Sequence, residues 1–326
     1  MVCSITPEAV FQLGIEMMGR VGKSEAKSQE DFVTQFGTSP PIVAEVARLL
    51  ESNTNHYTLY PKTQLKHILW AFTRLKVYEK EATLTNIVAT AYEGAPSGRT
   101  YRDWSWPLIT SIATLKNEVV RTTAVIAKSL NAAPCPHAYA SRCILSSLFC
   151  PKIHPNWANR RDGQGPWDKS ICVDGVTVGT TESYPFHSGN YDKKRNGPGK
   201  NFELCTDMAG NIVKISGPHP AGFYPDHVIF LEETMAALDI DEKCEGDRLY
   251  RNQLPAYFPA DRNDDEKEFA NRRRARHETM NGRLKRFGCL DKKFTHGDIK
   301  LSDCFEAVAV ITQLEIDAGK KLFDLM

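Results

Sequence analysis

The chain has 326 residues, of which 41% are hydrophobic and 10% aromatic, enough apolar material for one large folded domain or two smaller ones. Its 41 Lys and Arg against 40 Asp and Glu leave a formal net charge of +1, which excludes a histone-like protein and a highly charged disordered chain. Charged residues interrupt every apolar stretch before the roughly 18 residues that a spanning helix needs, so we expect no transmembrane segment and no membrane partner.

The cysteines indicate a reducing compartment. The nine cysteines are scattered and form no CxxC pair, so neither a disulfide framework nor a zinc ribbon is predicted. The cytosol and the nucleus are the compartments that fit such a chain.

Residues 1–130 form a predicted helical region. The clearest pattern lies between Thr63 and Tyr78, where apolar residues recur at the spacing of one helix face: Leu65, Ile68, Leu69, Phe72 and Leu75. Further helices are predicted over 83–91 and from 99 toward 121, separated by a turn rich in Gly and Pro. Two helices joined in this way fit a helix-turn-helix, and they fit a plain helical bundle equally well.

Residues 131–168 differ in composition from the rest, because Pro, Gly and Asn occur throughout them, and we predict an irregular linker or insertion there.

The remaining residues, 169–326, form a predicted domain of strands and helices. Strands are expected over 171–178, 201–207 and 212–215, the last two as a hairpin, with a break over 217–222. Helices are expected over 226–237, 268–286 and 303–321, the last of them buried. This order predicts an α+β or three-layer α/β/α domain.

Three carboxylates of this domain stand where such a fold can bring them together. Asp174 ends an apolar strand, Asp247 follows a glycine, and Glu278 lies in the most basic helix of the chain. Converging carboxylates can hold two Mg²⁺ ions about 3.5–4 Å apart for an in-line phosphoryl displacement, and neighbouring arginines can hold the phosphate backbone. Solvated surface carboxylates and a solvated basic helix face are the plainer interpretation of the same residues.

The order of several sequence blocks resembles the DDE endonuclease domain of PIF/Harbinger-like transposases. The blocks are ICVDGVT at 171–177, KNFE at 200–203, ISGP at 215–218, YPD at 224–226, GDRLY at 246–250 and RARHETMNGRLKRFG at 274–288. The resemblance covers residues 169–318, and FGTSP at 36–40 and HILWA at 67–71 are similar to N-terminal segments of some members.

The resemblance implies an RNase H-like fold, that is, an α/β domain with a mixed sheet and flanking helices, behind a mostly α-helical N-terminal region. It implies a DDE endonuclease and strand transferase that cuts DNA with two Mg²⁺ or Mn²⁺ ions. Asp174, Asp247 and Glu278 become the catalytic and metal-binding carboxylates. The DNA contacts implied are Arg272, Arg273, Arg274, Arg276 and Lys285. A nuclear homo-oligomer acting on element ends and target DNA is implied, and a separate Myb-like DNA-binding partner is known in related elements.

Two alternatives stay open at this point. Asp226 competes with Asp247 for the second carboxylate, but the fold has that carboxylate at the end of its fourth strand, and Asp226 suits a helix cap. The second alternative is a catalytically inactive, domesticated transposase that binds DNA. It is favoured by Leu249, where the family usually has Gly, and by the poorly apolar run 239–245 before Asp247.

Overall fold

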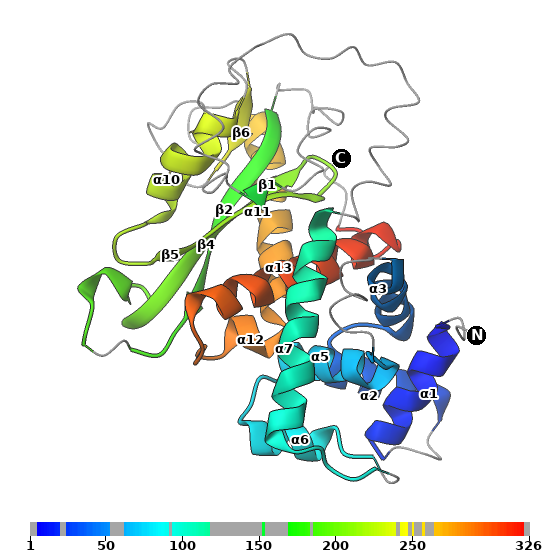
Figure 1. The fold of residues 1–326 in the computed structure, drawn as a ribbon. Coiled ribbons are helices and arrows are strands. Elements are labelled where there is room, and N and C mark those ends of the chain that lie inside the picture. Colours follow the sequence, from blue (N-terminus) through cyan, green and yellow to red (C-terminus); the bar gives the residue numbers. More distant parts are fainter. Residues whose placement is uncertain are drawn as a thin grey trace. The chain divides into compact units, whose positions relative to one another are not determined.

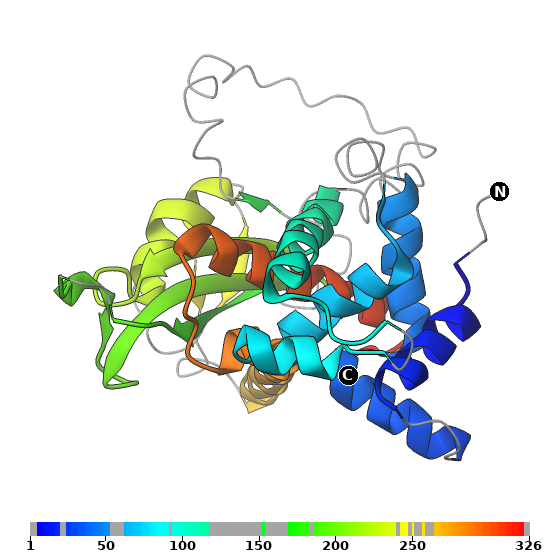
Figure 2. The same cartoon turned by 60° about the horizontal axis from the view of Figure 1, so that its bottom comes forward.

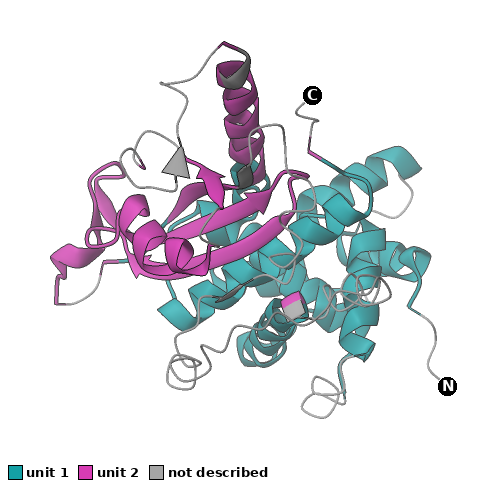
Figure 3. Ribbon diagram, turned by 90° about the horizontal axis from the view of Figure 1, so that it is seen from above, with its two compact units in different colours: residues 1–115, 178–181, 281–321 teal, residues 116–177, 182–280, 322–326 magenta. Residues whose placement is uncertain are grey.

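The computed structural model describes residues 5–19, 24–52, 62–90, 93–117, 152–153, 169–182, 185–238, 242–246, 250, 256–257 and 264–322 (Figure 1). The chain divides into two compact units (Figure 3). Unit 1 comprises residues 1–115, 178–181 and 281–321, and unit 2 comprises 116–177, 182–280 and 322–326. Among the described residues, no helix has the length and apolar character to cross a membrane.

Unit 1 is helical. Its helices are α1 (Pro7–Met17), α2 (Glu25–Phe36), α3 (Pro40–Ser52), α5 (Leu65–Val77), α6 (Glu81–Ile87), α7 (Gly98–Thr114), α12 (Gly288–Asp291) and α13 (Asp298–Asp317). The predicted helix over 63–78 is confirmed as α5, and the two that follow it in the sequence are confirmed as α6 and α7, with Pro107 inside α7. Helices α2 and α3 were not predicted individually.

The core of unit 1 forms around α7, which packs against α5 and α13. Helix α13 is buried along almost its whole length, as its apolar sequence predicts. Its buried Glu315 accepts a hydrogen bond from the hydroxyl of Thr38 at 2.6 Å and also pairs with Arg286. Thr38 from the segment 36–40 and Arg286 from the 274–288 block therefore both contact the buried Glu315 of α13.

Unit 2 contains a mixed sheet in the order β1-β5-β4-β2-β6-β7. These strands are β1 (Lys152–Ile153), β2 (Lys169–Gly179), β4 (Gly197–Asp207), β5 (Ile212–Pro220), β6 (Lys243–Glu245) and β7 (Ala256–Tyr257). Strands β4 and β5 are antiparallel, whereas β6 runs parallel to β2 and β7 parallel to β6. The short β3 (Tyr191–Asp192) pairs with the start of β4.

The predicted hairpin is confirmed by β4 and β5, but the break predicted over 217–222 begins only at Ala221. Strand β5 continues to Pro220, which pairs with Lys200. Gly217 permits this continuation, because it adopts a φ of +109° and a β-carbon there would lie 2.6 Å from the carbonyl oxygen of Asn201. Gly217 and Pro218 therefore lie within β5, at a point where this strand approaches β4 closely, and not in a turn.

Helices cover both faces of this sheet (Figures 1 and 2). The helical segment that begins with α10 (Asp226–Ile229) and continues to Ala237 packs its Phe230 against Ile171 and Val173 of β2. Helix α11 (Asp264–Lys285) lies against the other face, where His277 contacts Thr206. The predicted α/β arrangement, a mixed sheet with flanking helices, is confirmed at this level. Of the predicted insertion 131–168, all but Lys152 and Ile153 lies outside the described residues.

Candidate functional site

Asp174 lies on the central strand of the sheet. It belongs to β2, which is bordered by β4 on one side and by β6 on the other. Its side chain is partly buried, and Oδ1 accepts a hydrogen bond from the backbone N–H of Gly175 at 2.9 Å. Cys172, two residues earlier, pairs with Glu245 at the end of β6. Asp174 therefore lies two residues beyond the last pair between β2 and β6, and it does not end the strand as the sequence suggested, because β2 continues to Gly179.

Asp226 lies beside the same strand. It is the first residue of α10, and Pro225 occupies the N-cap position, so the capping role that the sequence suggested for Asp226 is wrong. Its carboxylate lies against Gly175 instead, where a β-carbon would be 2.2 Å from Asp226 Oδ1. Only glycine leaves room for a carboxylate at this position of β2. The structure thus brings Asp226 next to the residue that follows Asp174.

The buried Tyr250 shares the neighbourhood of these carboxylates. Its ring packs in the core cluster with Ile171 and Phe230. Burial raises the pKa of its hydroxyl well above the usual value, and the negative charges of Glu203, Asp226 and Asp174 raise it further. The three acidic side chains therefore lie within electrostatic range of one buried ring.

Glu203 is the member of this group that sequence reasoning missed. It is fully buried on β4, and Oε1 accepts a hydrogen bond from the hydroxyl of Thr234. Lys214 donates to the same hydroxyl at 2.6 Å, and Glu203 Oε2 has no hydrogen-bond partner among the described residues. Burial raises the pKa of Glu203 to about 7 against the opposing effect of Lys214. The alternating pattern of β4 indicated a half-buried strand, whereas helices cover both faces.

Asp247, Arg248 and Leu249 lie outside the described residues, whereas Gly246 before them and Tyr250 after them are described. Strand β6 before it is only three residues long, with Cys244 and Glu245 buried, in agreement with the poorly apolar run 239–245. Gly246 packs against the ring of Tyr250, where a β-carbon would meet the ring at 2.7 Å. Gly246 therefore lies against Tyr250, which belongs to the core cluster that includes Ile171 of β2.

Glu278 is exposed on α11. Its side chain is 62% exposed, and Oε1 lies 3.3 Å from Nε of Arg274, one helical turn earlier. Within the described ranges, no three His, Cys, Asp or Glu side chains are grouped so that they could hold a metal ion. The described carboxylates alone therefore do not fit a two-metal centre.

The arginines of α11 point to two sides of the helix. Arg273 and Arg276 are buried, the first 3.7 Å from Glu245 and the second donating to the carbonyl oxygen of Met208 at 2.6 Å. Arg272 and Arg274 are exposed. Lys285, at the end of the helix, is partly exposed and belongs to unit 1. Of the five predicted DNA contacts, Arg272 and Arg274 are therefore the exposed arginines.

A second surface of unit 2 combines aromatic rings with basic side chains, and sequence reasoning did not identify it as a site. Phe186 is 59% exposed and Phe223 is 58% exposed, which is unusual for phenylalanine. The ring of His187 meets that of Phe223 at 5.6 Å, and Gly222 packs on the carbonyl oxygen of Tyr191 at the base of the β3–β4 hairpin. The exposed residues Lys193, Lys194 and Arg195 form the turn of that hairpin. We call these five residues, 186, 223 and 193–195, the aromatic–basic surface.

The aromatic–basic surface is connected to the strand that carries Asp174. Arg195 Nη1 donates to the carbonyl oxygen of Thr177 at 2.5 Å. The Thr177 hydroxyl donates to Asn201 at 2.7 Å, and Asn201 Nδ2 donates to the carbonyl oxygen of Tyr224 at 2.8 Å. The surface and the carboxylates Asp174 and Asp226 thus lie on adjoining parts of unit 2.

Comparison with known proteins adds no relative: no family model, no curated protein and no solved structure matches the chain.

Proposed function

We propose that the chain is a transposase-derived DNA endonuclease of the DDE type with an RNase H-like catalytic domain. The order of the strands carries the proposal. Counted from β2, the strand with Asp174, and without the two-residue β3 that pairs only with β4, the fourth strand of the sheet is β6, which lies parallel to β2 and directly before Gly246 and Asp247. A first carboxylate on the central strand and a second after the fourth strand are what the resemblance requires. The order of the strands in the sheet agrees with both requirements.

Asp174 is the first catalytic carboxylate in this proposal, Asp247 the second and Glu278 the third. Mg²⁺ or Mn²⁺, when bound, would polarise the phosphodiester and lower the pKa of the attacking water. Because the described residues contain no group of three such ligands, the proposal takes Asp247, which lies outside them, as the second ligand. Asp226, which lies against Gly175, is the alternative second carboxylate.

DNA binding in this proposal uses the exposed residues of unit 2. Arg272 and Arg274 supply positive charge on α11, and the aromatic–basic surface adds three cations and two exposed rings. Cations hold phosphates without regard to sequence, and exposed rings stack on unpaired bases. Nuclear location, homo-oligomerisation and a Myb-like partner belong to the same proposal.

A second candidate is a domesticated DNA-binding protein without nuclease activity. The position of Glu278 favours it, because its carboxylate is exposed and pairs with Arg274, and the described residues contain no metal-binding group. Both candidates use Arg272 and Arg274, whereas only the enzyme requires Asp174, Asp247 and Glu278.

Nicking of supercoiled plasmid in Mg²⁺ or Mn²⁺ separates the two candidates. We expect metal-dependent nicking that Asp174→Asn and Asp247→Asn abolish, while Glu268→Gln, an exposed carboxylate on the same helix as Glu278, leaves it unchanged. The Asp226→Asn variant is tested in parallel with Asp247→Asn, and the second carboxylate is the residue whose substitution abolishes nicking. Salt-sensitive DNA binding without nicking, in the presence of element ends and a Myb-like partner, would establish the binding protein instead.

A further inference from the structure

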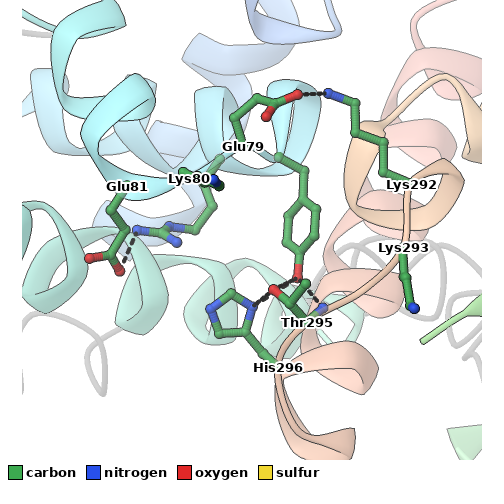
Figure 4. A pocket seen from close by; sticks show the side chains of 9 residues that line it. Glu79, Lys80, Glu81, Lys292, Lys293, Thr295 and His296 are labelled. Carbon is green, nitrogen blue, oxygen red and sulfur yellow. Dashed lines mark hydrogen bonds and ion pairs between the residues drawn. The ribbon is translucent and has the colours of Figure 1, made fainter. Parts of the chain in front are cut away.

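Unit 1 contains a pocket of about 560 Å³, within the size range of small-molecule sites in proteins. All of the residues that line it belong to unit 1. Two segments face each other across it, Glu79–Glu81 at the junction of α5 and α6, and Lys292–His296 before α13 (Figure 4). Arg74 and Tyr78 complete the lining.

The charge of this pocket is positive. Four cations line it, Arg74, Lys80, Lys292 and Lys293, against two carboxylates, Glu79 and Glu81. No aliphatic side chain belongs to the lining, which disfavours an apolar ligand. The excess of two positive charges matches an anion that carries one to two negative charges, as a phosphate group does near neutral pH.

Both carboxylates of the pocket are already engaged. Glu79 pairs with Lys292 at 2.5 Å, and Glu81 pairs with Arg102 from α7. Lys80 and Lys293 are both exposed, and across the described part of the chain neither has a carboxylate within ion-pair distance. These two ammonium groups are therefore available to an anion that enters the pocket.

Arg74, one of these four cations, is the buried one. Its guanidinium is 1% exposed and lies between the rings of Tyr101 and Trp106, at 4.6 and 4.7 Å from their centroids. Nε donates to the hydroxyl of Ser105, whereas Nη2 has no hydrogen-bond partner among the described residues and lies 3.8 Å from Glu81. A buried guanidinium shielded from water contributes a stronger field at the pocket than an exposed lysine does.

Hydroxyl and imidazole groups of fixed orientation line the side of the pocket opposite Glu81. Tyr78 adopts a φ of +45°, which is rare for a bulky residue, and its ring stacks on Phe294 at 5.1 Å. Its hydroxyl lies 2.8 Å from Nδ1 of His296 and accepts the backbone N–H of Thr295 at 3.1 Å. Thr295, an exposed residue of the same lining, has its hydroxyl 3.5 Å from the Tyr78 hydroxyl and 3.4 Å from Nδ1 of His296, and this hydroxyl can rotate to donate its proton to an oxyanion.

We propose that this pocket binds a phosphate group, held by Lys80, Lys293 and the hydroxyl of Thr295 above the charge of Arg74. The volume exceeds that of a single phosphate, so the group belongs to a larger ligand, either a free nucleotide or a nucleic-acid strand. The inference stands apart from the proposed nuclease, because all of its residues lie in unit 1.

The test uses the full chain and isothermal titration calorimetry with inorganic phosphate, AMP and a short single-stranded oligonucleotide. We expect saturable binding of at least one of these probes. Lys80→Ala and Lys293→Ala should each weaken it roughly tenfold, because each removes a charge-assisted contact. Both lysines are exposed, so the variants should keep the melting temperature of the native chain. Lys27→Ala, which removes an exposed charge of the same unit outside the pocket, should leave the affinity unchanged.

The three probes identify the source of the phosphate. Binding of AMP that depends on Lys80 and Lys293 assigns a nucleotide site, and binding of the oligonucleotide alone with the same dependence assigns a strand contact. The proposal is overturned if no probe binds saturably, or if Lys80→Ala and Lys293→Ala change the affinity no more than Lys27→Ala does. Plasmid nicking does not enter these outcomes, so a failed nuclease proposal leaves them intact.

Discussion

Arg273 Nη1 lies 3.7 Å from Glu245 Oε2, and both side chains are buried between α11 and the end of β6. The most basic helix of the chain thus uses one of its arginines as an interior ion pair. Removing one partner of a buried pair leaves an uncompensated charge, which typically costs about 3–5 kcal/mol. This arginine is therefore an interior residue of unit 2, whereas Arg272 and Arg274 of the same helix are exposed.

The first prediction separates the arginines of α11 by role. Arg273→Met should lower the free energy of unfolding by about 3 kcal/mol, and adding Glu245→Gln should restore part of the loss. Arg272→Ala with Arg274→Ala should leave stability unchanged and reduce the slope of log K against log salt for DNA by about two. Chemical denaturation and DNA titrations at several salt concentrations measure both effects. A reduced salt slope in Arg273→Met at native stability would contradict this division.

The second prediction concerns the aromatic–basic surface. Phe186→Ala and Phe223→Ala should each weaken binding of DNA with unpaired bases roughly tenfold, because stacking of a base on a ring contributes about 1–3 kcal/mol. Their exposure means that the folded state should lose little stability. Fluorescence anisotropy with single-stranded and duplex probes measures the difference. Ile299→Ala is the control, since Ile299 is 81% exposed and belongs to unit 1, and equal losses in all three variants would refute the stacking role.

The third prediction concerns Gly175. Gly175→Ala should destabilise unit 2 by about 2–3 kcal/mol, because its β-carbon would overlap the carboxylate of Asp226. Gly197→Ala is the matched control on β4, where the nearest atom to an added β-carbon is 4.0 Å away. Adding Asp226→Ala to Gly175→Ala removes the obstructing carboxylate and should recover stability. Thermal melting of the three variants provides the measurement, and equal effects of Gly175→Ala and Gly197→Ala would disprove the contact.

The fourth prediction is a pH dependence from Glu203. Its pKa in the folded protein is about 7, above the usual value of 4.5, so the folded state binds the extra proton. The stability that this proton provides is complete below pH 4.5 and is lost as the pH rises through about 7. Glu203→Gln, which is neutral at every pH, should flatten the decline between pH 4.5 and 7. Urea denaturation across this range measures the slope, and an unchanged slope in the variant would rule out Glu203 as its source.

The fifth prediction has the opposite sign and comes from His277. Burial, with the charges of Arg276 and Arg273, lowers the pKa of this histidine from 6.5 to about 3. The folded state therefore holds the neutral ring, and its contribution to stability is complete above pH 6.5 and falls as the pH drops toward 3. His277→Gln should reduce the acid sensitivity of unfolding in that window. His187→Gln, at an exposed position, is the control and should leave the acid branch unchanged.

Local patterns in the sequence predicted much of the secondary structure. The apolar spacing of α5 and α13, and the alternation and turn of the β4–β5 hairpin, depend on residues close together in the chain, so the sequence alone was sufficient for them. The sequence also predicted a strand at Asp174 and a helix at Glu278, and these residues lie on β2 and α11. The short strand β6 agrees with its poorly apolar sequence.

Tertiary structure decided which side chains point inward. Charged side chains are normally expected on the surface, but three of them are buried here because helices cover both faces of the sheet: Arg273, Arg276 and Glu203. The contact of Asp226 with Gly175 joins residues far apart in the chain. The pocket above Arg74 likewise joins the end of α5 to the segment before α13. No periodicity encodes such pairs, because they depend on how separate elements pack and not on the spacing within any one of them.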